Sequence, residues 1–217
     1  IIIVSNNDSI LIANDKYLTS QFLKKNNLNY PETSLLCDID SEKIIYPKIV
    51  KPRIGYRSRN VSIVYNSDDI DKLNIKDKSE YVIQEYLTND NEEYSCGTIT
   101  YEGFYKSIIL KRTLKDGNTF NVIHDKNYYY KTEKYLLSVN NSLKPFGPCN
   151  YQLRIDSKGK PKIFEINLRH SGTTYFRTLF GFNEIDYLIN KILNEKEIDF
   201  NLSYGKAIRY FEEKRTL

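Results

Sequence analysis

The sequence has 217 residues, of which 40% are hydrophobic and 28% charged, the ordinary balance of a globular protein with one large domain or two small lobes. The formal net charge of +4 comes without a dense basic run, which argues against a nucleic-acid partner and permits a polyphosphate ligand. Cys37, Cys96 and Cys149 are widely spaced and form no CxxC or Cys/His cluster, so we predict reduced thiols in a cytoplasmic protein and no zinc site.

The start of the chain shows no signal peptide and no membrane span, because it has neither a basic n-region nor a long apolar stretch. The chain does not begin with Met and contains none, so we expect a fragment from which a preceding N-terminal domain is absent. Modified Met residues missing from the sequence are the alternative explanation.

The N-terminal part is predicted to contain short strands at residues 1–4 and 10–13, followed by a helix. Asn14–Asp15 is an N-cap signal, and apolar side chains then recur at helical spacing until two asparagines and a proline end the helix. Lys16 lies in the first turn, where a cation opposes the helix dipole. It is interpreted equally well as a solvated lysine or as a phosphate ligand.

Two predicted strands, residues 48–51 and 61–65, flank a loop from Arg53 to Asn60 that includes Gly55 and Ser58. Cations and small residues in a loop can hold phosphates through charge and backbone N–H groups. With a single glycine the loop is neither a P-loop nor a GxGxxG motif, so a basic surface hairpin is an equally good interpretation.

Residues 81–87 are predicted to form a strand, because they are rich in β-branched and aromatic side chains, and the polar break at 88–93 is interpreted as a hinge between two lobes. An antiparallel meander is predicted over residues 93–123, with a tight turn at Glu102–Gly103. The other predicted elements are a short helix at 67–73, a helix from Asp125 to about Val139, an apolar helix at 173–182 and a last strand at 206–211. A further helix is predicted after Asn183, and its inward-facing side chains are Ile185, Leu188, Ile189, Ile192 and Leu193.

Residues 149–169 are predicted to form two strands joined by a turn. Alternation along each strand places these polar side chains on one face: Asn150, Gln152, Arg154, Glu165, Asn167 and Arg169. A four-residue loop pairs Gln152 with Glu165 and Asn150 with Asn167, with Cβ atoms about 5 Å apart. Such hard oxygen ligands suit Mg²⁺. An ordinary hairpin with a polar outer face is the alternative interpretation.

Several separated segments agree in order and spacing with one known arrangement: NDKYLT, YPKIVKPRIGYRSRNV, VIQEYL, EEYSCG, LKR, CNYQLR and FEINLRHSGTT, between Asp15 and Arg169. In these segments the chain resembles the ATP-grasp superfamily, especially its carbamoyl-phosphate-synthetase-like and carboxylate–amine ligase branch. The resemblance implies an α+β fold in which two lobes with antiparallel sheets clamp a nucleotide. It divides the chain into an N-terminal part at 1–45, a small lobe with phosphate lid and adenine hinge at 46–87, and a C-terminal lobe with the metal site at 88–217.

The resemblance also implies roles for individual residues. Binding of ATP is assigned to Lys16, Lys51, Ser58, Gln84, Glu85, Tyr86, Leu87, Glu93 and Lys111. Within this set residues 84–87 match the adenine hinge, Glu93 matches the acid that holds the ribose hydroxyls, and Lys111 forms a basic pair with Arg112. Arg112 and Arg169 are assigned to charge stabilisation on the transferring phosphate. Coordination of Mg²⁺, or Mn²⁺ in its place, is assigned to Gln152, Glu165 and Asn167.

The implied activity is that of an ATP- and Mg²⁺-dependent ligase, which activates a carboxylate as an acyl phosphate for attack by an amine. Its partners would be small-molecule carboxylate and amine substrates, a missing N-terminal domain or partner subunit, and a second copy in a homodimer. The alternatives are a carbamoyl-phosphate-synthase-like subunit and an ATP-grasp shell that binds nucleotide without turnover, which the glycine-poor lid favours. His124, beside Asp125, is interpreted as a surface or capping residue and His170 as part of the acceptor pocket, and neither as a general base.

Overall fold

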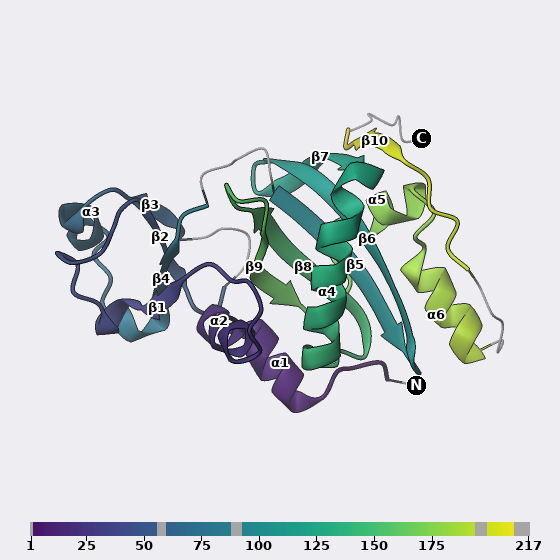
Figure 1. Ribbon diagram of the computed structural model, residues 1–217, viewed down its shortest axis with the longest axis horizontal. Helices are drawn as coiled ribbons and strands as arrows, with labels where there is room; N and C mark the ends of the chain where they lie inside the picture. The colour runs from purple at the N-terminus through teal and green to yellow at the C-terminus, as the bar shows by residue number, and fades with distance from the viewer. Residues whose placement is uncertain (1, 56–59, 88–92, 194–198, 211–217) are drawn as a thin grey trace, which may run out of the picture.

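The computed structural model describes residues 2–55, 60–87, 93–193 and 199–210, and it contains two antiparallel sheets (Figure 1). The smaller sheet has the strand order β1–β4–β2–β3, and the larger sheet has the order β10–β7–β6–β5–β8–β9. Helices accompany both sheets, so the α+β architecture predicted from the sequence is confirmed. None of the described helices is long and apolar enough to cross a membrane.

The small lobe is built on the four-stranded sheet. Its elements are β1 (Thr33–Leu35), η1 (Leu36–Asp38), β2 (Lys48–Pro52), β3 (Ser62–Val64), α3 (Ser67–Lys72), η2 (Lys78–Glu80) and β4 (Tyr81–Glu85). Val50, Val64 and Ile83 are buried in its own apolar core. The predicted strands and the short helix of this region are therefore present, although each differs by a residue or two from its predicted bounds.

The large lobe is built on the six-stranded sheet. Its strands are β5 (Glu93–Tyr101), β6 (Phe104–Lys115), β7 (Asn118–His124), β8 (Gly147–Ile155), β9 (Pro161–Asn167) and β10 (Gly205–Ile208). The predicted meander is confirmed, and Glu102 and Gly103 have positive φ angles of 47° and 84° in the tight turn between β5 and β6. The predicted last strand begins at Gly205 and ends at Ile208, and Phe211 lies outside the described residues.

Helices cover both faces of the large sheet (Figure 1). They are α1 (Asn7–Asn14), α2 (Lys16–Lys25), η4 (Lys126–Tyr128), α4 (Tyr129–Leu143), α5 (Thr174–Leu179) and α6 (Glu184–Leu193). Leu136 of α4 packs in a core with Ile109 of β6, whereas Phe176 of α5 packs in a separate core with Ile108. Because side chains alternate along β6, these two neighbours mark the two opposite faces of the sheet.

The strand predicted at 10–13 is wrong, because α1 covers residues 7–14, and residues 2–4 are not in a strand either. The Asn6 side chain accepts a hydrogen bond from the backbone N–H of Ser9, which caps the helix. A run of four apolar residues has no periodicity that separates a strand from a buried helical turn. Asp15 caps α2 as predicted.

The predicted inner face of α6 is partly wrong. Leu188 is buried, but Ile185, Ile189 and Leu193 are 45%, 48% and 69% exposed. The helix instead turns Glu184 into the protein, where its carboxylate forms an ion pair with Arg177. Hydrophobic periodicity could not reveal this rotation, because it counts a charged residue as outward-facing.

His124 differs from its predicted environment. His124 is 1% exposed, and its Nδ1 lies 2.8 Å from the carbonyl oxygen of Ser203, so it holds the segment before β10 and is not a surface residue. Burial lowers the pKa of His124. His170 is half-exposed, and its Nδ1 lies 2.7 Å from Glu184.

Arg177 is fully buried under the large sheet, where it connects α5, α6 and β8. Its guanidinium donates hydrogen bonds to the carboxylate of Glu184, to Oδ1 of Asn150 and to the hydroxyls of Ser171 and Thr173. A Cβ atom at Gly97 on β5 would lie 2.5 Å from this guanidinium. The absence of a side chain at residue 97 therefore creates the space for the buried charge.

We expect Gly97→Ala to destabilise the fold by about 1–3 kcal/mol, because a well-bonded Arg177 cannot move without losing buried hydrogen bonds. The measurement is the free energy of unfolding in urea. Gly172→Ala is the matched control, because a Cβ at Gly172 meets no atom within 4 Å. Equal stability of the two variants would contradict the assigned role of Gly97.

Candidate active site

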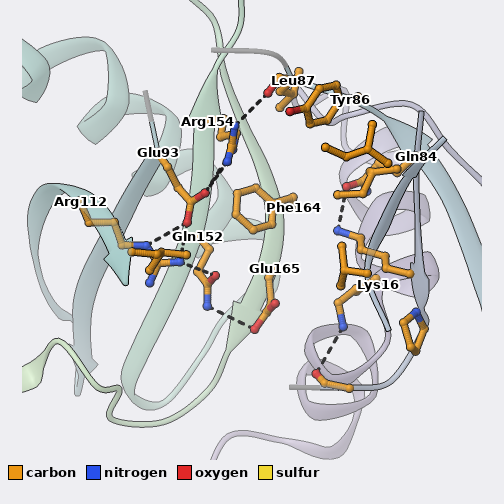
Figure 2. A pocket seen from close by; sticks show the side chains of 17 residues that line it. Lys16, Gln84, Tyr86, Leu87, Glu93, Arg112, Gln152, Arg154, Phe164 and Glu165 are labelled. Atoms are coloured by element: carbon orange, nitrogen blue, oxygen red, sulfur yellow. Dashed lines mark hydrogen bonds and ion pairs between the residues drawn. The ribbon is translucent and has the colours of Figure 1, made fainter. Parts of the chain in front are cut away.

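A cavity of about 510 Å³ lies between the two sheets, and both lobes contribute to its wall (Figure 2). The structure brings together in this wall nine of the residues singled out in the sequence: Lys16, Lys51, Gln84, Tyr86, Leu87, Glu93, Arg112, Gln152 and Glu165. Segments from α2 to β9 therefore meet at one place, although they are far apart in the chain.

Lys51 on β2 is a buried cation of this cavity, only 5% exposed. Its Nζ donates a hydrogen bond of 2.9 Å to Oε1 of Gln84 and lies 5.2 Å from the ring centre of Phe164. Burial lowers the pKa of Lys51 to about 7, and Lys16 also lowers it, whereas Glu165 raises it. An anion bound beside Lys51 would stabilise its charged form.

Lys16 is a second buried cation, 9% exposed, at the first residue of α2. Its Nζ lies 3.4 Å from the carbonyl oxygens of Arg53 and Gly55, which belong to the segment after β2. Burial is also the largest cause of the lowered pKa of Lys16. Of the two interpretations open for this residue, the solvated lysine is therefore excluded.

The hairpin of β8 and β9 has the predicted register at the proposed metal ligands. Asn150 pairs with Asn167 and Gln152 pairs with Glu165. Oε1 of Glu165 accepts hydrogen bonds from Nε2 of Gln152 at 3.2 Å and from Nδ2 of Asn167 at 3.0 Å. One carboxylate and two amide groups are thus gathered on the cavity side of the hairpin.

A metal at this place would depend on these three groups. Among the residues that the structure describes, no cluster of three or more His, Cys, Asp or Glu side chains could hold a metal ion. A carboxylate and amide oxygens are hard donors, which fit Mg²⁺ when water or phosphate oxygens complete its coordination. The donor set therefore fits Mg²⁺ better than it fits a metal that prefers nitrogen or sulfur ligands.

A β-bulge between Gln152 and Leu153 adds a residue to β9 that the sequence did not reveal. Leu153 pairs with Ile163, so Phe164 has no partner in the register. As a result, the consecutive residues Phe164 and Glu165 both line the cavity. Phe164 was missed because simple alternation places it on the face opposite Glu165.

Glu93 is held between two arginines on neighbouring strands. Its Oε1 accepts from Nε and a terminal nitrogen of Arg112 at 3.0 and 2.7 Å, and its Oε2 accepts from the corresponding atoms of Arg154 at 3.2 and 2.7 Å. Arg154 also donates to the carbonyl oxygen of Leu87 at 3.0 Å, as Figure 2 shows. Arg154 had been placed on the polar face in the sequence, but without a role.

Two described residues assigned to ATP, Lys111 and Glu85, do not line this cavity. Lys111 precedes Arg112 on β6, so its side chain lies on the opposite face of the large sheet. The Glu85 carboxylate accepts hydrogen bonds from Nζ of Lys162 at 2.7 and 2.8 Å. Ser58 lies outside the described residues.

Asn167 and Arg169 line a second cavity of about 300 Å³. It shares Lys16, Gly55 and Glu165 with the first cavity, so the two adjoin at the proposed metal ligands. His170, expected in an acceptor pocket, does not line either of these two cavities.

Comparison with known proteins identifies the family. Residues 77–214 match the family described as "ATP-grasp in the biosynthetic pathway with Ter operon". The chain belongs to this ATP-grasp family. The matched region contains β4 and the whole described large sheet, and hence most of the cavity wall.

Individual relatives agree with this assignment. The chain is 27% identical over 184 residues to a D-alanine–D-alanine ligase of Petrotoga mobilis, covering 83% of this chain and 55% of that protein. It is 34% identical over 116 residues to the uncharacterized protein MG011 of Mycoplasma genitalium, covering 51% of this chain and 37% of that protein. The chain thus spans about half or less of the length of these relatives.

The ATP-grasp fold also appears among solved structures. The biotin carboxylase of Campylobacter jejuni, solved as a β,γ-ATP complex, superimposes with a TM-score of 0.78 at 13% identity. The superposition covers 94% of this chain and 51% of that chain. At this identity the similarity shows the fold alone.

Proposed function

We propose that this ATP-grasp protein is an ATP- and Mg²⁺-dependent ligase that activates a carboxylate as an acyl phosphate for attack by an amine. The observation that carries the proposal is the single cavity that joins the buried cations Lys16 and Lys51 to the carboxylate of Glu165. Phosphoryl transfer requires positioning and charge neutralisation more than a protein nucleophile. The cavity wall offers cations and oxygen donors for this purpose.

The nucleotide would lie along the cavity with its base at Tyr86 and Leu87 and its phosphates at the two lysines. Tyr86 and Leu87 follow β4 at the end of the cavity where Arg154 lies. Nζ of Lys51 lies 5.2 Å from the ring centre of Phe164, the residue that precedes Glu165 on β9. The ring of Phe164 provides an apolar wall between these two ends.

Glu165, Gln152 and Asn167 would hold Mg²⁺, which would supply positive charge to neutralise the phosphates. Arg112 donates a hydrogen bond of 2.9 Å to Oε1 of Gln152, so its guanidinium is already fixed beside this group. Together with Arg169 it would stabilise the charge that develops on the transferring phosphoryl group.

The second cavity would take the carboxylate substrate. It adjoins the first at Lys16 and Glu165, which places an acid bound there next to the end of the polyphosphate. Its wall combines apolar side chains, such as Ile10 and Ala13, with Arg169. The name of the Petrotoga mobilis relative, D-alanine–D-alanine ligase, supports small amino acids as the first substrates to examine.

The test is to incubate the full-length protein with ATP, Mg²⁺ and amino acids, singly and in pairs, with bicarbonate included in the panel. We expect ADP and phosphate to form only when the matching acid is present. Nucleotide binding without ADP formation across a wide panel of amino acids would instead identify an ATP-grasp protein that binds nucleotide without turnover. Dependence on bicarbonate would favour the carbamoyl-phosphate-synthase-like alternative.

We expect Glu165→Gln to lower the turnover rate by about 10²- to 10³-fold, because it removes the one carboxylate among the proposed metal ligands. The rate of ADP formation at saturating Mg²⁺ is the readout. Glu42→Gln, the same change at an exposed residue of the small lobe, is the control and should keep the wild-type rate. Full turnover by Glu165→Gln would disprove the assignment of the metal ligands.

Nucleotide affinity should fall as the pH rises above about 7, because the pKa of Lys51 is lowered to about 7 by burial and only its protonated form attracts phosphate. Below this pH the charged form is present before binding. Above it each binding event must take up a proton, so the affinity should fall by up to about tenfold per pH unit until the pKa of the complex is reached. Calorimetric titration with ADP from pH 6 to 9 measures the slope, and Lys51→Arg should abolish it. The same slope in both proteins would contradict this role of Lys51.

A further inference from the structure

The carboxylate of Glu93 has no capacity left for a ribose. An ionised carboxylate offers about four lone-pair sites, and four N–H groups of Arg112 and Arg154 occupy them. The Glu93 side chain is 10% exposed, so water does not readily replace these donors. A ribose hydroxyl would have to displace a charge-assisted hydrogen bond, which is stronger than a neutral one. The geometry therefore gives Glu93 the task of holding the two arginines.

The planar guanidinium of Arg154 donates hydrogen bonds to two different partners. Nε and one terminal nitrogen bind Glu93 on the neighbouring strand, and the other terminal nitrogen donates to the carbonyl oxygen of Leu87, which follows β4 of the small lobe. A lysine ammonium cannot reproduce this arrangement, because it lacks a planar fork with donors on both sides. Arg154 thus connects the two lobes at the end of the cavity proposed for the base.

The hydrogen bonds continue from Glu93 to the proposed metal ligands. Arg112 binds Glu93 and also donates to Gln152 at 2.9 Å, and Gln152 donates to Glu165 at 3.2 Å. A continuous chain therefore runs from the Leu87 carbonyl through Arg154, Glu93, Arg112 and Gln152 to Glu165 (Figure 2). Glu93 accepts hydrogen bonds from both arginines and so links them, whereas Arg112 donates to Gln152 and Gln152 donates to Glu165.

We propose that Arg154 is a positioning residue of the nucleotide site, which holds Glu93 and thereby fixes Arg112 and Gln152 beside Glu165. Arg154 would not need to touch the transferring phosphate. Its effect would be to keep the metal-binding end of the cavity in place when the base end is occupied. This inference rests on the proposed function, because it assumes that nucleotide and metal bind in this cavity.

The chain offers a matched control for loss of a contact between the lobes. Lys162 pairs with Arg154 across β8 and β9, and its Nζ binds the Glu85 carboxylate at 2.7 and 2.8 Å. Lys162→Gln therefore also removes a charged contact between the lobes, within two residues of Leu87. Lys162 does not line the cavity and does not belong to the hydrogen-bonded chain.

The first experiment measures the binding of ADP and its Mg²⁺ dependence in the full-length protein, together with kcat and KM for ATP. We expect Arg154→Gln and Arg154→Lys to weaken the apparent Mg²⁺ affinity by about 10- to 100-fold, the usual effect of losing a partner that orients metal ligands. Lys162→Gln should stay within about twofold of wild type, because Lys162 neither lines the cavity nor contacts a proposed metal ligand. Equal effects of Arg154→Gln and Lys162→Gln, or full rescue by Arg154→Lys, would overturn the proposal.

The second experiment needs no ligand and separates this inference from the proposed function. Thermal and urea unfolding of Arg112→Gln, Arg154→Gln and the double variant give a double-mutant cycle. With one arginine left, Glu93 keeps a counter-ion, and with neither it is a buried unpaired charge. The double variant should therefore lose more stability than the sum of the two single losses. Additive stability losses would overturn the proposed coupling of Arg154 to Arg112 through Glu93, even if the protein binds ATP. A non-additive cycle in a protein that binds no nucleotide would instead disprove the proposed function alone.

Discussion

The lining of the cavity proposed as the active site depends on the bulged register between β8 and β9. The ladder keeps Gln152 opposite Glu165, and the extra residue lets Phe164 face the cavity as well. A regular ladder could present either the aromatic ring or the carboxylate at this place, since neighbouring side chains point to opposite faces. The bulge therefore allows an aromatic ring and a carboxylate, the proposed metal ligand, to line the cavity from consecutive positions of β9.

Desolvation is the second constraint on the cavity. Lys16 and Lys51 are both buried, and burial lowers the pKa of each. Glu165 favours the charged form of both lysines, but the two cations also repel each other. A polyphosphate would compensate this charge, and the same burial that destabilises the free lysines would strengthen their interaction with it. The burial of two cations in one cavity wall is therefore an electrostatic argument for the proposed anionic ligand.

The sequence predicted those parts of the fold that follow from local periodicity and turn chemistry. The pairing of Gln152 with Glu165 was predicted from alternation and a four-residue loop, and the Asp15 cap from its side chain. The four-residue loop is wrong, because Ile155 pairs with Pro161, and the bulge after Gln152 restores the predicted pairs. The errors arose where a distant partner decided the outcome. Glu184 is buried because Arg177 lies opposite it, and the bulge at Phe164 leaves no local signature. Local patterns contain no information on such partners.

The described contacts between the lobes include ionic and directional ones. The small lobe has its own apolar core around Val50, separate from the two cores of the large lobe. Across the boundary, Lys162 binds Glu85 and Arg154 binds the carbonyl oxygen of Leu87. Polar contacts of this kind depend on precise distances, whereas apolar packing tolerates small shifts. A site whose wall is divided between two cores therefore needs such contacts to hold its geometry, and Arg154 is the one that also reaches the proposed metal ligands through Glu93.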